Sequence, residues 1–101
     1  MLTSKQRSQL KKMAHDIQPI IQVGKAGLNE NLIKQVDDAL ESRELIKGTV
    51  LNNSPINANE ATKEICEKTN AEAVIVVGSK FVLYRQSVKN SSSPVSSILR
   101  G

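Results

Sequence analysis

The sequence predicts an α+β domain, a two-layer α/β sandwich in which helices pack on a mixed four-stranded sheet. Amphipathic segments of helical period alternate with short apolar runs, in the order α-β-α-β-α-β-β. A helix between two strands returns the chain to the end of the sheet from which it started, so we expect right-handed crossovers and parallel neighbours. The last two apolar runs are separated by a short glycine turn, which predicts an antiparallel hairpin.

The first helix is expected over residues 4–16. Thr3 and Gln6 have the spacing of a capping box at its start. Its inward face carries the apolar side chains Leu10, Met13, Ala14 and Ile17. Its outward face carries the basic side chains Lys5, Lys11, Lys12 and His15. Pro19 disfavours helical geometry in the residue before it, so the helix should stop there.

Residues 19–23 are expected to form the first strand. The second helix should follow an Asn29 N-cap, with Leu28 and Ile33 at the spacing of a hydrophobic staple. The second strand is expected over residues 44–51. Gly48 inside it indicates either a bulge or a close packing contact.

The third helix should begin near Asn57, with an acidic outer stripe of Glu60, Glu64 and Glu67. The β-branched run at residues 73–77 predicts a central strand buried on both faces. A turn at residues 78–80 leads into the last strand at residues 81–85. The folded domain is therefore expected to span residues 1–85, with residues 86–101 as a flexible tail.

Charge is polarised along the 101 residues, whose net charge is +4. Residues 1–28 carry net +4, residues 29–70 net −3 and residues 71–101 net +3. A polarised basic surface favours an anionic polymer as partner. One cysteine, no apolar h-region at the start and no membrane-length apolar run predict a cytoplasmic protein without membrane association. The absence of an evident apolar seam favours a monomer.

The segment Gly24-Lys25-Ala26-Gly27 is the strongest functional signal, because it is a basic, glycine-bracketed loop between a strand and a helix. Glycine lets the backbone approach a ligand closely, and a helix N-terminus offers unpaired N–H groups and a positive dipole end. In KH-type modules, a GXXG loop clamps the backbone of single-stranded nucleic acid. One Phe and one Tyr are too few for a stacking platform, so recognition must depend on backbone contacts.

Five ordered segments carry a family resemblance: residues 2–7, 22–28, 44–47, 77–78 and 81–85. With these segments the chain resembles the YhbY-type RNA-binding proteins, the bacterial form of the CRM (chloroplast RNA splicing and ribosome maturation) domain. The resemblance implies a fold like the C-terminal domain of translation initiation factor three. It also implies association with precursors of the large ribosomal subunit. The chain departs from the family in its low net charge and in Gly48.

The expected RNA-binding residues are the loop and the basic side chains that widen its footprint. They are Gly24, Lys25, Ala26, Gly27, Lys5, Lys11, Lys12 and Arg85. No cofactor and no metal site are expected, and catalysis is disfavoured because His15 and Cys66 have no evident partner for nucleophilic or metal chemistry. The alternative is a protein-interaction module that reaches the ribosome through a protein partner, with the acidic stripe or the tail as its surface.

Overall fold

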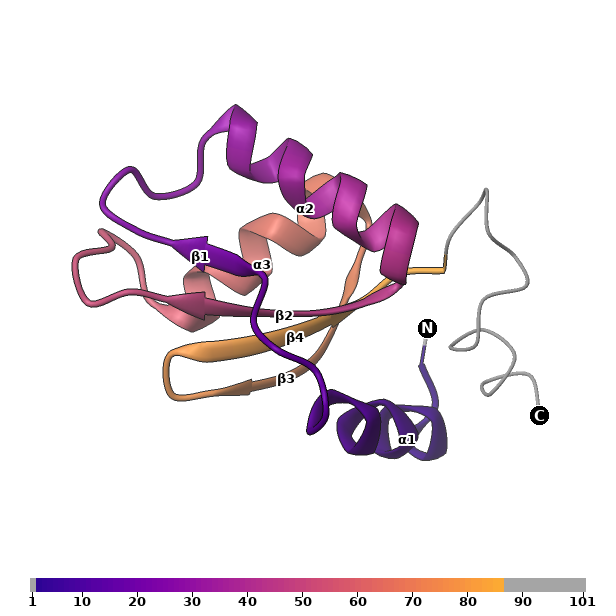
Figure 1. The fold of residues 1–101 in the computed structure, drawn as a ribbon. Coiled ribbons are helices and arrows are strands. Elements are labelled where there is room, and N and C mark those ends of the chain that lie inside the picture. The colour runs from indigo at the N-terminus through magenta and orange to yellow at the C-terminus, as the bar shows by residue number, and fades with distance from the viewer. Residues whose placement is uncertain (1, 87–101) are drawn as a thin grey trace.

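Seven helices and strands lie along residues 2–86, the part of the chain that the computed structural model describes (Figure 1). Their order is the predicted one. Their bounds are α1 Ser4–Ala14, β1 Ile21–Val23, α2 Glu30–Arg43, β2 Leu45–Val50, α3 Ala58–Thr69, β3 Glu72–Val77 and β4 Lys80–Tyr84. The expected tail, apart from its first residue, lies outside the described residues.

The helices begin at the caps that the sequence predicts. Thr3 and Gln6 form a reciprocal capping box at the start of α1, and Asn57 and Glu60 form another at the start of α3. The Asn29 side chain accepts a hydrogen bond from the first turn of α2. Each cap satisfies backbone N–H groups that the helix itself cannot pair.

The sheet has the strand order β1-β2-β4-β3. β1 runs parallel to β2, and β4 is antiparallel to both β2 and β3. The fold class and the mixed sheet are therefore confirmed. The crossover through α2 makes the parallel pair β1–β2, and the hairpin after α3 makes the antiparallel pair β3–β4. β4 also pairs antiparallel with β2, so it lies between the two strands that α3 connects.

The prediction that the apolar run at residues 73–77 is a central strand is wrong. β3 lies at an edge of the sheet, and β4 occupies the centre between β2 and β3. β3 is apolar on both faces because Ala73 and Val76 pack against one cluster of side chains and Val74 and Ile75 against another. Two covered faces give an unbroken apolar run at any position in a sheet. The strand ends at Val77, which is 63% exposed.

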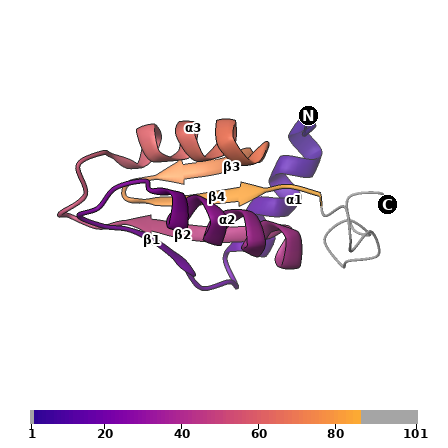
Figure 2. The ribbon, with the colours of Figure 1, turned by 90° about the horizontal axis from the view of Figure 1, so that it is seen from above.

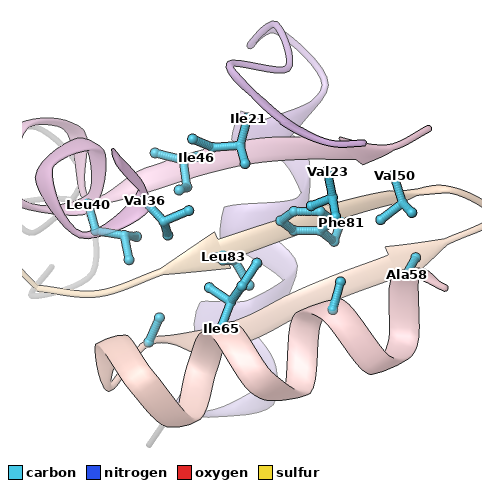
Figure 3. Close-up of a cluster of buried hydrophobic side chains, with 12 residues drawn as sticks. Ile21, Val23, Val36, Leu40, Ile46, Val50, Ala58, Ile65, Phe81 and Leu83 are labelled. Atoms are coloured by element: carbon cyan, nitrogen blue, oxygen red, sulfur yellow. The ribbon is translucent and has the colours of Figure 1, made fainter. Parts of the chain in front are cut away.

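Helices cover both faces of the sheet. α2 and α3 lie side by side over one face (Figure 2) and bury the larger cluster, which includes Phe81, Leu83, Ile46, Val36 and Ile65 (Figure 3). α1 packs alone on the opposite face. The predicted two-layer sandwich thus describes the sheet with α2 and α3, and α1 adds a partial third layer.

Gly48 makes the close packing contact that was one of its two predicted roles. A Cβ atom built at this position would lie 2.3 Å from Cζ of Phe81, whose ring is fully buried. The predicted alternative, a bulge at Gly48, is wrong. The register shift of the sheet lies in β3, between Ala73 and Ile75.

Candidate nucleic-acid interface

The loop between β1 and α2 is a closed turn. The Gly27 N–H donates a hydrogen bond to the Gly24 carbonyl at 2.9 Å, and Gly27 has a φ of 66°. Lys25 and Ala26 are exposed at the tip, and α2 begins three residues after Gly27. The turn therefore exposes Lys25 in the loop that leads into a helix N-terminus, where an anion is favoured.

The two glycines of the loop have different structural roles. Gly27 is in the left-handed region, and a Cβ there would lie 3.1 Å from Cγ of Pro55. At Gly24 an added Cβ would make ordinary contacts of 3.6 Å with Leu51 and 3.8 Å with Asn53. The fold thus requires glycine at position 27 but tolerates a side chain at position 24.

Gly27→Ala should lower the free energy of unfolding by about 1–2 kcal/mol, because a left-handed conformation is costly for a residue with a Cβ. Gly24→Ala should change it by less than about 0.5 kcal/mol. Urea denaturation of both variants checks this. Equal losses in the two variants would contradict the assignment of the left-handed turn to Gly27 alone.

Three connections meet at the end of the sheet that carries this loop (Figure 1). The Leu51 N–H donates to the Val23 carbonyl at 2.8 Å, which joins the β2–α3 connection to the end of β1. The Val50 N–H donates to the Ser79 carbonyl at 2.7 Å, which adds the β3–β4 turn. α2 and α3 both start here, so two helix N-termini lie at one end of the molecule.

Lys80 is a basic residue of this end that the sequence reasoning missed. It follows the β3–β4 turn, pairs with Thr49 and is exposed. The predicted hairpin could have indicated the position of Lys80, because the turn between β3 and β4 lies at the same end of the sheet as the loop.

Acidic residues also lie at this end of the sheet. Glu30 and Glu60 lie in the first turns of α2 and α3, where Glu60 accepts a hydrogen bond from the Asn57 N–H.

The structure does not bring the basic residues of α1 to the loop. Lys5, Lys11 and Lys12 are exposed, as predicted, but α1 lies on the opposite face and toward the other end of the sheet (Figure 1). The Leu2 N–H donates to the Glu72 carboxylate at the first residue of β3. Closeness in sequence to the loop therefore does not become closeness in space.

Arg85 also lies away from the loop. Its N–H donates to the Glu44 carbonyl, which places it beside the start of β2, whereas the loop lies beyond the end of β2. The six residues of β2 separate the two by about 20 Å. Nη1 of Arg85 contacts Oδ1 of Asp37 at 2.5 Å and the Thr69 carbonyl at 2.8 Å. Nη2 lies 3.3 Å from Oε2 of Glu41.

Arg7, beside the basic face of α1, is also engaged within the protein. Its guanidinium donates to the Ala73 and Val74 carbonyls of β3. An edge strand exposes unpaired backbone groups, and this arginine satisfies part of that edge. The guanidiniums of Arg7 and Arg85 therefore both make structural contacts within the fold.

The titratable side chains do not form a catalytic arrangement in the described part of the chain. Burial raises the pKa of the Cys66 thiol, and the nearby Glu72 charge adds to this effect. A thiol with a raised pKa is a poor nucleophile at neutral pH. Among residues 2–86, no three His, Cys, Asp or Glu side chains are grouped so that they could hold a metal ion. No helix in that range is long and apolar enough to cross a membrane.

A GXXG turn before a helix is the arrangement with which KH domains clamp an RNA backbone, so the fold and the loop point to the class of RNA-binding domains. The family model of the CRS1 / YhbY (CRM) domain matches residues 2–85, and the chain belongs to this family. The described relatives bear the name RNA-binding protein, and neither they nor the family are described as enzymes.

Relatives occur in bacteria and archaea. The chain is 43% identical over 90 residues to Probable RNA-binding protein YqeI of Bacillus subtilis, a match that covers 89% of this chain and 94% of the relative. It is 36% identical over 86 residues to Probable RNA-binding protein MJ0652 of Methanocaldococcus jannaschii, a match that covers 83% of this chain and 63% of the relative. The solution structure of SAV1595 from Staphylococcus aureus superposes with a TM-score of 0.74 at 51% identity, covering 89% and 94%.

Proposed function

We propose that this chain binds RNA, associates with precursor RNA of the large ribosomal subunit and assists ribosome assembly, acting as a monomer in the cytoplasm. Family membership and the names of the relatives support RNA as the ligand. The observation that carries the proposal is the exposed Lys25 at the tip of a closed turn whose last residue, Gly27, lies three residues before the Asn29-capped start of α2.

In this proposal the loop holds one phosphate group of the RNA. The Lys25 ammonium supplies the full charge, and the first N–H groups of α2 add a positive dipole end. Gly24 has no side chain, so the sugar–phosphate backbone can approach the loop closely. Phosphate contacts position a nucleic acid without reading its sequence, so we expect weak sequence preference at this site.

The other basic residues that were predicted to bind RNA have different roles in this proposal. Lys5, Lys11 and Lys12 form a separate basic surface on α1, which would contact a more distant segment of a long, folded RNA. Arg85 is left out of the proposed interface, because its guanidinium is bonded to Asp37, Glu41 and Thr69.

Lys25→Ala should weaken binding to precursor large-subunit RNA and reduce the salt dependence of binding. Each phosphate neutralised on single-stranded RNA contributes about −0.7 to the slope of log affinity against log salt. Losing one contact should therefore make the slope shallower by about 0.7. A salt titration of wild type and variant measures both quantities.

Gly24→Ala should also weaken binding, because the added methyl group would obstruct the approach of the RNA backbone while leaving the stability of the protein unchanged.

Lys63→Ala is the matched control, because it removes one exposed lysine from the acidic outer side of α3. It should leave the slope within error of wild type. Equal affinities and slopes for Lys25→Ala and Lys63→Ala would remove the loop from the interface. An unrelated RNA of equal length separates general RNA binding from a preference for ribosomal RNA. If the wild type bound neither RNA yet remained on ribosomal particles, recruitment through a protein partner would replace the proposal.

A further inference from the structure

A cleft of about 380 Å³ lies beside the first half of β2, which β1 is too short to pair with. β1 pairs with Gly48, Thr49 and Val50 only, and the preceding Ile20 N–H donates to the Lys47 carbonyl. Beyond that bond, the first residues of β2 have no neighbouring strand on this side among the described residues. The cleft fills this gap, between the end of α1, the connection to β1 and the end of α2. Its lining comprises Met13, Ile17, Gln18, Ile20, Arg43, Leu45, Ile46 and Lys47.

The floor of the cleft is apolar because the two hydrophobic clusters meet there. Met13 and Ile17 belong to the cluster under α1, and Ile20 packs against the cluster under α2 and α3. The three side chains are only partly buried, so the cleft exposes apolar surface that neither cluster covers.

The rim of the cleft is cationic. Of the three arginines within residues 2–86, Arg7 and Arg85 are bonded internally, whereas the exposed Arg43 guanidinium makes no hydrogen bond or ion pair there. Nζ of Lys47 donates to the Ala14 carbonyl at 3.1 Å, and an ammonium has two further N–H donors. No Asp or Glu lines the cleft.

We propose that this cleft binds one unstacked nucleotide of the RNA, with its base on the apolar floor and its phosphate on Arg43 and Lys47. The inference rests on the proposed function. An unstacked base needs an apolar or planar surface on which to pack. No aromatic side chain lines the cleft, Phe81 is fully buried and Tyr84 packs partly buried against the cluster under α1, so the base would pack on aliphatic side chains. Arginine is suited to phosphate and also stacks on planar groups. Gln18 offers an amide donor and acceptor to a base edge.

The cleft and the GXXG loop lie along one edge of the molecule. Ile20, which lines the cleft, and Gly24, which opens the loop, are four residue steps apart along the chain, with the three residues of β1 between them. At about 3.3 Å per strand residue, the two sites are about 13 Å apart. β1 between them is an edge strand, and its Gln22 side chain is exposed. One single strand of RNA can therefore follow β1 and occupy both sites.

The test uses a labelled single-stranded RNA of about ten nucleotides, a length typical of single-strand binding sites. Arg43→Gln should weaken its binding about tenfold, since one charge-assisted contact is lost, and should make the salt slope shallower by about 0.7. Lys63→Gln is the control of equal charge change and should bind like wild type. Thermal unfolding of each variant confirms that it remains folded.

An abasic scan of the same RNA tests the base pocket itself. In the wild type, removing the base at one position should weaken binding more than at the others, and Ile17→Ala should abolish that difference. Arg43→Gln binding as tightly as Lys63→Gln, or a flat abasic scan, would overturn the inference. If Lys25→Ala lost RNA binding but Arg43→Gln did not, the proposed function would be supported and the nucleotide site in the cleft would be excluded. An Arg43→Gln variant that binds RNA normally but no longer binds poly-glutamate would assign the cleft to an acidic protein partner instead.

Discussion

Gly48→Ala should lower the free energy of unfolding by about 3 kcal/mol, the upper part of the range for overpacked cores. The added methyl carbon would lie 2.3 Å from Cζ, 2.6 Å from Cε2 and 2.9 Å from Cε1 of Phe81. The two residues are direct partners across β2 and β4, so the ring lies over the glycine. Phe81 is completely buried and cannot swing into solvent. The midpoint and slope of urea denaturation measure the loss.

A smaller residue at position 81 should recover part of this loss. Phe81→Leu alone removes packing volume and is itself destabilising. Combined with Gly48→Ala, it should give a coupling energy of about 1–3 kcal/mol in a double-mutant cycle, because the clash disappears. Thr49→Ala, at the next and partly exposed position of β2, controls for alanine in a strand and should cost less than about 1 kcal/mol. Additive losses for positions 48 and 81 would show that the ring moves aside at little cost.

The structural features that could be predicted correctly are those that depend on residues close together along the chain. Caps at Thr3, Asn29 and Asn57 depend on side chains within one helical turn, and all three are confirmed. Strand order is decided by tertiary packing. Residues 73–77 are apolar on both faces because α3 covers one face and α1 the other, a pattern that an edge strand and a central strand share.

In the candidate site, too, the local features could be predicted from the sequence and the tertiary ones could not. The GXXG turn is local, and its closure at the start of α2 follows from two glycines and an N-cap. Lys12 is near the loop in sequence, but residues 15–20 carry the chain from α1, on the face opposite α2 and α3, to β1 at the edge of the sheet (Figure 1). Charge counted along a sequence cannot show which cations are bonded internally. That distinction separates Arg85 from Arg43, and it required the positions of Asp37 and Glu41.

Arg85→Met should lower the free energy of unfolding by about 2 kcal/mol and leave RNA affinity unchanged. The arginine joins three elements: it caps the C-terminal end of α3 at the Thr69 carbonyl and contacts Asp37 and Glu41 of α2 from the end of β4. Its side chain is 18% exposed, but Asp37 is 53% exposed, so solvent screens that pair. The larger part of the loss should come from Thr69 and Glu41.

Arg85→Lys is the matched control, because it keeps the charge but loses the planar fork that contacts both helices at once. Its stability should fall between wild type and Arg85→Met. RNA affinity is measured well below the unfolding transition, together with its salt slope. If both arginine variants keep the wild-type slope while stability falls, the residue is structural. A slope shallower by about 0.7 in Arg85→Met, with no change in Arg85→Lys, would instead place a phosphate on Arg85 and extend the interface to both ends of the sheet.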